Sequence, residues 1–238
     1  MEVNLNRYNE QISRIWDENV TVRAKDLEDG TDYSYIEIIK PFVINEVCNL
    51  TSSISTILDI GCGCGYLTNA VFQHNRHIIE GIDISEKSVL YSKKRYPHIE
   101  FIHQDIFKIS RFKKYDLCLS VMTLNNIPEI STFFNIANEI LEPNGNLILV
   151  LPHPCFWPMR HLKEKSFTYT DTKVYEIPFV TKGRKDYSSS ILYFHRPIEV
   201  YIYNIQKAGF KILNCKELID DVNKNNPPDI IGLILQKL

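Results

Sequence analysis

Short apolar runs alternate with helical segments through the middle of the chain. The apolar runs lie at 56–60, 77–82, 99–103, 115–120 and 145–151. The segments between them that have helical spacing lie at 66–73, 86–96 and 131–141. Strands that alternate with helices are typical of a parallel sheet built from βαβ units. The pattern therefore predicts five parallel strands joined by helices.

The two ends of the chain depart from this alternation. Residues 1–54 are polar and helical, and they are predicted to form an N-terminal helical cap. Two further strands are expected at 210–218 and 230–237, and the loop between them leaves no room for a crossover helix, so they must be antiparallel. For residues 55–238 we predict an α/β, Rossmann-like sheet of seven strands, mostly parallel with an antiparallel last strand, with helices on both faces.

An insertion separates the fifth strand from the next helix. Residues 152–195 lack a clear helix or strand period and are rich in aromatic side chains. Compact domains usually reserve loops of this length for lids or binding sites. We expect a lid or substrate insertion here, with the core of a small subdomain as the alternative. The helix after it is expected to start at Pro197 and to end before Gly209.

Composition and charge narrow the function classes. The chain has 44% hydrophobic and 24% charged residues and a formal net charge of -2, so it offers no general field for nucleic acid or an anionic membrane. Its apolar runs are too short to cross a bilayer, and its start lacks the pattern of a secretory signal. A cytoplasmic protein is expected. The six cysteines contain no CxxC pair, so we predict reduced thiols and no metal site.

The most specific local pattern is a glycine-rich turn that follows the first strand. Gly61, Gly63 and Gly65 stand between an apolar strand and a helix, where glycines let the backbone approach a ligand. A dinucleotide-binding turn would carry its third glycine at position 66, which is Tyr66. The pattern favours a nucleotide-like ligand other than NAD, and a purely structural turn is the alternative.

Acidic residues follow the next two strands. Asp83 ends the second strand, where it can accept hydrogen bonds from both ribose hydroxyls, and Asp105 follows the third strand beside the expected adenine position. Either acid alone could be a solvated loop residue. Because the carboxyl ends of parallel strands meet at one edge of the sheet, their occurrence together with the glycine turn predicts one binding site.

With these motifs, the sequence resembles the class I S-adenosylmethionine-dependent methyltransferases over roughly residues 30–238. The resemblance implies S-adenosylmethionine as the cofactor. It implies that the three glycines pass under the methionine part, that Asp59 orders the amino group, and that Asp83 binds the ribose. Ile84 would pack on the adenine, Asp105 with Ile106 would hold the adenine edge, and Val121 with Met122 would lie near the sulfonium.

A narrower resemblance concerns the acceptor. The segment His153-Pro154-Cys155-Phe156 after the fifth strand is similar to one found in a subgroup that methylates small molecules. Methylases that act on amino groups of DNA or glutamine carry [DN]PP[YF] after the fourth strand, whereas this chain reads Asn125-Asn126-Ile127-Pro128. This departure argues against base methylation. We predict methyl transfer to an oxygen or nitrogen of a small acceptor, aromatic or heterocyclic in character.

The candidate catalytic bases are His153 and His195, because proton removal is needed when the nucleophile is protonated. A structural capping role is the alternative for each. The acceptor is expected to contact aromatic residues of the cap and the insertion, namely Tyr33, Phe156, Trp157, Tyr169 and Tyr193.

Two other functions fit parts of the sequence. A tRNA or protein methyltransferase would use a basic patch made of Lys163, Lys165, Lys182, Arg184 and Lys185. A noncatalytic nucleotide-binding protein of the same fold is the second alternative, although the intact glycine turn and Asp83 argue against it. A monomer or a homodimer is expected, with no membrane partner, and nucleic acid is the less favoured partner.

Overall fold

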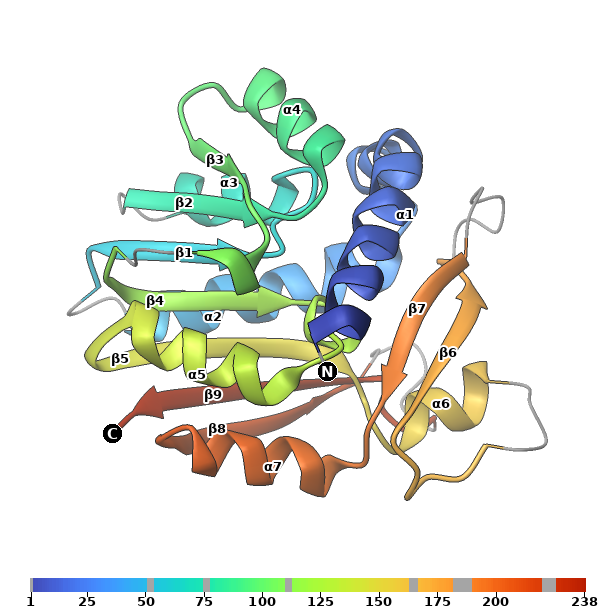
Figure 1. The fold of residues 1–238 in the computed structure, drawn as a ribbon. Helices are drawn as coiled ribbons and strands as arrows, with labels where there is room; N and C mark the ends of the chain where they lie inside the picture. The colour runs from blue at the N-terminus through green and yellow to red at the C-terminus, as the bar shows by residue number, and fades with distance from the viewer. Residues whose placement is uncertain are drawn as a thin grey trace.

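The computed structural model describes residues 2–50, 54–74, 78–109, 113–162, 167–181, 190–219 and 226–238. Its centre is a seven-stranded sheet with the order β3-β2-β1-β4-β5-β9-β8 (Figure 1). The strands are β1 (Thr56–Ile60), β2 (Ile78–Asp83), β3 (Glu100–His103), β4 (Tyr115–Val121), β5 (Leu141–Pro152), β8 (Phe210–Leu218) and β9 (Ile230–Lys237).

The strand directions match the predicted topology. The strands β1 to β5 pair in parallel, and β9 lies antiparallel between β5 and β8. The Rossmann-like sheet with a reversed last strand is therefore confirmed. One boundary differs: β5 begins at Leu141, before the predicted start at 145. The register between β4 and β5 shifts there, which accommodates the extra residues.

Helices cover both faces of the sheet (Figure 1). Consecutive strand residues point to opposite faces, so Leu58 packs in one apolar cluster and Ile57 in the other. The first cluster includes residues of α5 (Ile130–Ile140) and α7 (Ile198–Lys207). The second includes residues of α2 (Lys40–Leu50), α3 (Tyr66–His74) and α4 (Glu86–Arg95). The strands β1, β2, β4 and β5 therefore bury apolar side chains on both faces of the sheet, as is typical of parallel strands.

The residues at the ends of α4 and α7 explain where these two helices begin and end. The Ser85 side chain accepts a hydrogen bond from the backbone N–H of Ser88 and caps α4. Gly209 has a φ of 80° just after α7, a conformation that favours glycine. Pro197 is the N-cap of α7 rather than its first helical residue, so the helix begins at Ile198.

The predicted helical cap divides into parts with different positions. The long helix α1 (Glu2–Glu28) lies at the carboxyl-end edge of the sheet, where it packs against α4 and β7. A π-helical segment, η1 (Ser34–Ile39), then leads directly into α2. The apolar residues Phe42 and Val43 place α2 in the core of the sheet.

The insertion contains regular structure that the sequence pattern did not predict. It forms a short helix, α6 (Phe156–His161), and an antiparallel pair, β6 (Lys173–Pro178) and β7 (Ser190–His195). Figure 1 shows this pair standing beside α1, outside the main sheet. Two short 3-10 helices, η2 (Ile106–Lys108) and η3 (Leu124–Asn126), follow β3 and β4.

Candidate functional site

A cavity of about 900 Å³ lies at the carboxyl ends of the parallel strands. The strand ends β1, β2 and β4 form its floor, and α1, α6 and the β6–β7 pair contribute to its walls. This volume is at the upper end of the range of small-molecule sites, and the position is where open α/β sheets bind ligands.

The glycine turn after β1 forms one side of this cavity. Gly61 has a φ of 77° and lies so close to Thr123 that any Cβ there would collide with the threonine side chain. Gly63 has a φ of 53°, and a Cβ added to it would meet no protein atom within 4 Å. Both glycines line the cavity. The turn is therefore packed against the loop after β4 on one side and open on the other.

Asp83 holds this turn at the end of β2. Its carboxylate accepts one hydrogen bond from the backbone N–H of Gly63 and one from that of Ser85, each 2.8 Å long. Burial raises the pKa of Asp83, and the two N–H donors act against this rise. The carboxylate lines the cavity next to Ile84, in the positions predicted to bind ribose and adenine.

Asp105 lies after β3 and also lines the cavity, together with Ile106. One carboxylate oxygen caps η2 by accepting from the N–H of Phe107 at 3.0 Å. The other accepts from the Asn9 side chain of α1 at 2.9 Å. Helix α1 is thereby joined to the residue predicted to hold the adenine edge.

Val121 and Met122 end β4 at the cavity wall. Met122 has a φ of 56°, a left-handed conformation that is uncommon for a residue other than glycine. Such conformations cost roughly 1–3 kcal/mol and occur often at ligand sites. The strain fits the predicted place of Met122 beside the reacting atoms of the cofactor.

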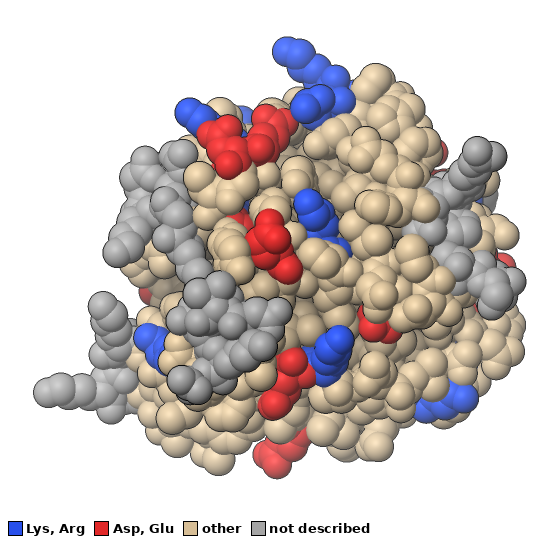
Figure 2. All heavy atoms as spheres, turned by 180° about the vertical axis from the view of Figure 1, so that it is seen from behind, with Lys and Arg blue, Asp and Glu red and all other residues tan. Residues whose placement is uncertain are grey.

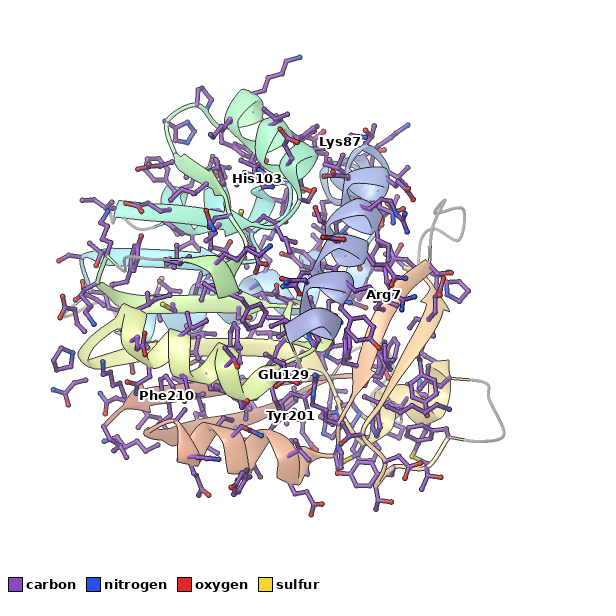
Figure 3. All side chains as sticks on the ribbon, viewed as in Figure 1. Arg7, Lys87, His103, Glu129, Tyr201 and Phe210 are labelled. Atoms are coloured by element: carbon purple, nitrogen blue, oxygen red, sulfur yellow. The ribbon has the colours of Figure 1, made fainter. Side chains whose placement is uncertain are left out.

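Helix α1 makes further hydrogen bonds to the strand ends. Asp17 accepts from the Ser85 hydroxyl at 2.6 Å and from the backbone N–H of Lys87 at 2.9 Å. Ser13 donates to the backbone carbonyl of Ile84 at 3.0 Å. Figure 3 shows Lys87 at the end of α4 that faces α1. These contacts fix α1 over the part of the cavity formed by β2.

The other side of α1 contacts the β6–β7 pair and the segment after β6. The Trp16 and Phe179 rings meet edge to face with centroids 5.3 Å apart. Thr181 donates to the buried carboxylate of Asp26 at 3.0 Å. The guanidinium of Arg23 lies 5.7 Å from the centre of the Phe179 ring. Helix α1 and the insertion therefore cover the cavity together.

Arg23 is the residue of this cover that could hold an anionic group of a ligand. It lines the cavity and donates to the Asp32 carboxylate at 2.7 Å. Its guanidinium also lies 5.0 Å from the centre of the Tyr35 ring. An arginine has five N–H donors, so a bond to Asp32 is compatible with binding a carboxylate in the cavity.

Aromatic rings form the wall contributed by the insertion. Trp157 lies between two rings, with centroids 4.6 Å from Tyr193 and 4.7 Å from His161. All three residues line the cavity. The Nε2 atom of His161 lies 3.7 Å from the Asp229 carboxylate, which also pairs with Arg160. This wall combines flat apolar surface with titratable groups.

The two histidines predicted to be bases do not line the cavity. His153 is buried, its Nε2 lies 3.1 Å from the Glu217 carboxylate, and its Nδ1 accepts from the backbone N–H of Cys155. His195 is also buried, and its Nε2 lies 2.8 Å from the carbonyl oxygen of Tyr169. Burial lowers the pKa of both imidazoles. Their geometry matches the structural alternative, in which each histidine satisfies nearby polar groups.

Two predicted cofactor residues lie behind the cavity wall. Asp59 is buried and accepts from the Thr68 hydroxyl at 2.7 Å, and burial raises its pKa to about 7. Gly65 packs against Phe101, because a Cβ at this position would lie 2.8 Å from the ring. Both residues pack against other parts of the protein next to the glycine turn and do not line the cavity. The other eight predicted cofactor residues, Gly61, Gly63, Asp83, Ile84, Asp105, Ile106, Val121 and Met122, line the cavity.

Three of the five predicted acceptor residues point elsewhere. Tyr33 is 37% exposed and belongs to a separate surface depression. Phe156 packs on the His153 ring, and the Tyr169 hydroxyl accepts from the first N–H of α7, that of Ile198. Trp157 and Tyr193 are the two that line the cavity.

The basic patch of the alternative functions, Lys163, Lys165, Lys182, Arg184 and Lys185, lies outside the described residues. On the face shown in Figure 2, acidic and basic side chains are interspersed among uncharged ones. Within the described ranges, no helix has both the length and the apolar character needed to cross a membrane. The same ranges contain no group of three potential metal ligands among His, Cys, Asp and Glu.

The sequence did not identify the contribution of α1 to the site. Asn9, Trp16 and Arg23 all line the cavity. They are spaced seven residues apart, which places them on one face of the helix with the apolar lining residues Ile12, Val20 and Leu27, and this spacing was the available signal.

Comparisons with known proteins agree with this geometry. A family model described as a methyltransferase domain matches residues 51–196. The ubiquinone biosynthesis O-methyltransferase of Coxiella burnetii (strain RSA 331 / Henzerling II) is 24% identical over 66% of this chain and 64% of its own length. That of Rickettsia prowazekii (strain Madrid E) is 23% identical over 77% of this chain and 70% of its own length. A solved S-adenosylmethionine-dependent methyltransferase from Methanosarcina mazei superposes with a TM-score of 0.63, at 19% identity over 81% of this chain and 97% of the other.

The matches to the curated relatives cover only part of the length of those proteins. The chain spans between 38% and 70% of the lengths of the relatives it matches. Residues 51–196, which match the family model, include the strands that carry the glycine turn and Asp83.

Proposed function

Because the chain belongs to this methyltransferase-domain family, we propose that it transfers the methyl group of S-adenosylmethionine to an oxygen or nitrogen atom of a small, planar acceptor. The family match confirms a methyltransferase domain, and S-adenosylmethionine-dependent neighbours of the same fold support S-adenosylmethionine as the cofactor. The activity and the acceptor class are what we propose here.

The observation that carries the proposal is a single cavity with two chemically different parts. One part contains the open glycine turn and the carboxylates of Asp83 and Asp105, which suit a nucleoside. The other part is walled by aromatic rings, among them Trp16, Trp157 and Phe179. A donor bound in the first part would present its methyl group to a flat acceptor in the second.

Methyl transfer requires the protein to align the methyl donor with the acceptor and to exclude water. Bound S-adenosylmethionine supplies a methyl group on a positively charged sulfur; the acceptor–carbon bond forms as the sulfur–carbon bond breaks. Holding both reactants in line can supply much of the rate enhancement. The walls formed by α1 and the insertion shield the cavity, and aromatic rings near a cationic sulfur stabilise its charge.

His161 is the base that the geometry favours where the acceptor carries a proton. It lines the cavity and stacks on Trp157, and its Nε2 lies 3.7 Å from the Asp229 carboxylate. It replaces His153 and His195 in this proposal because neither of them lines the cavity, and their Nε2 atoms face Glu217 and the Tyr169 carbonyl. The names of the two bacterial relatives, both O-methyltransferases, favour an oxygen acceptor.

Calorimetry with S-adenosylhomocysteine and NAD tests the cofactor half of the proposal. We expect S-adenosylhomocysteine to bind and NAD to bind weakly, since Tyr66 occupies the position of the third dinucleotide glycine. Tighter binding of NAD would contradict the proposal. Incubating the protein with radiolabelled S-adenosylmethionine and separate panels of phenols, aromatic amines and tRNA then tests the acceptor. Transfer to tRNA without transfer to any small molecule would overturn the acceptor class.

A further inference from the structure

A buried amide oxygen without a partner lies in the cavity wall. Asn125 is on η3, directly after β4, and is 5% exposed. It lines the cavity, and its Oδ1 has no hydrogen-bond partner among the described residues. Leaving a buried polar atom unpaired is costly, so native structures usually provide a partner from protein, water or ligand.

The neighbouring asparagine fixes which atom of Asn125 is unpaired. The Nδ2 of Asn126 donates to the backbone carbonyl of Leu192 at 2.6 Å. A carbonyl can only accept, so this bond sets the orientation of the Asn126 amide and turns its Oδ1 toward the Nδ2 of Asn125 at 3.5 Å. The atom of Asn125 left over is therefore its oxygen. Among the described residues, no N–H or O–H group donates to this oxygen.

The surroundings limit what this donor can be. Leu192 precedes Tyr193 on β7, and Tyr193 together with Trp157 forms the aromatic wall of the same cavity. Asn125 follows Met122 in the loop that is predicted to lie near the reacting methyl group. A ligand that reaches Asn125 thus has flat apolar surface beside it and one acceptor atom to satisfy.

We infer that Asn125 determines acceptor specificity: its Oδ1 accepts a hydrogen bond from an O–H or N–H group of the planar acceptor. This inference rests on the proposed function. It assigns the substrate class as phenols or aromatic amines that keep at least one such hydrogen, and it disfavours analogues in which that group is already alkylated. Asn126 acts as a positioning residue that holds the Asn125 amide in this orientation.

Phenol and anisole form a matched pair of probes, because anisole has a methyl group in place of the hydroxyl hydrogen. The only two tryptophans of the chain, Trp16 and Trp157, both line the cavity, so intrinsic fluorescence reports binding there. Titrations use the full chain saturated with S-adenosylhomocysteine. We expect phenol to bind roughly 10-fold more tightly than anisole, the usual effect of one hydrogen bond to an otherwise unpaired buried group.

Two variants decide whether Asn125 causes this preference. In Asn125→Leu the preference for phenol should vanish, and Asn125→Ala should give the same result if the leucine variant does not fold. The control is Asn69→Leu on α3, since the Oδ1 of Asn69 is likewise buried and unpaired but Asn69 does not line the cavity. This control should keep the preference of the unmodified protein.

The outcomes separate this inference from the proposed function. Equal binding of phenol and anisole, binding of neither, or an unchanged preference in both Asn125 variants would overturn the role of Asn125. Failure to bind S-adenosylhomocysteine would instead overturn the proposed function. The phenol and anisole titrations would then be made without it, and they would still decide the inference.

Discussion

Replacing Asp83 with alanine is the most informative single change in the cofactor half of the site. The carboxylate lines the cavity, and each of its oxygens already accepts one backbone N–H at 2.8 Å, from Gly63 or from Ser85. Each oxygen keeps a further lone pair, which is where ribose hydroxyls would donate. Asp83→Ala therefore removes ligand contacts and also two bonds that hold the glycine turn.

The size of the effect follows from these bonds. The lost hydrogen bonds to this charged group contribute about 1.5–3 kcal/mol in total, so the dissociation constant of S-adenosylhomocysteine should rise roughly 10- to 100-fold. The free energy of unfolding should also fall, by about 1–3 kcal/mol, because two turn N–H groups lose their partner. Isothermal titration calorimetry measures the first effect and denaturant unfolding measures the second.

Asp116 provides the matched control. It lies at the start of β4, and one of its carboxylate oxygens accepts from the backbone N–H groups of Ser55 and Thr56 at 2.8 and 2.9 Å. Asp116→Ala should lower stability to a similar extent and leave ligand affinity unchanged, because Asp116 does not line the cavity. Unchanged affinity in Asp83→Ala, or equal weakening in both variants, would refute the assignment of Asp83 to the ligand.

Three further predictions test other parts of the molecule. Burial raises the pKa of Asp59 to about 7, so the folded state holds this proton more tightly than the unfolded state. The free energy of unfolding should then fall between about pH 4 and about pH 7, by up to roughly 4 kcal/mol, and denaturant titrations of Asp59→Asn should show this fall reduced. His161→Ala should lower turnover by about 10²- to 10⁴-fold in the radiolabel assay, whereas His153→Ala should lower mainly the melting temperature; the reverse pattern would return the base to His153. Arg196 is buried and donates to the carbonyls of Phe194, Ile127 and Pro128, so Arg196→Lys should cost about 2–4 kcal/mol in chemical denaturation, and a loss below about 0.5 kcal/mol would contradict this role.

The fold and the cofactor half could be predicted because their signals are local in the sequence. A strand, its turn and the following helix are contiguous, so the position of Gly63 relative to β1 is set by the chain itself. Parallel topology then brings Asp83 to the same edge without any knowledge of packing. For Asp59 the prediction gave the right strand, but the pleat points its side chain to Thr68 instead of the cavity.

The acceptor half depends on contacts between distant segments. His153 and His195 stand at the ends of β5 and β7, as close to the site in sequence as Tyr193, yet their rings face Glu217 and Tyr169. Side-chain direction at the ends of strands is decided by neighbouring elements, and no spacing rule reports it. The β6–β7 pair was missed because neither Lys173–Pro178 nor Ser190–His195 alternates strictly between apolar and polar residues.

Helix α1 explains how two distant parts of the chain can form one site. At its amino-terminal part Asn9 bonds to Asp105, and near its carboxyl end Asp26 bonds to Thr181 after β6. Between them Trp16 packs on Phe179. The helix thus contacts a residue proposed to hold the adenine and the segment that walls the acceptor. These contacts connect the part of the cavity proposed for the cofactor with the part proposed for the acceptor, which gives the amino-terminal helix a place in both halves of the site.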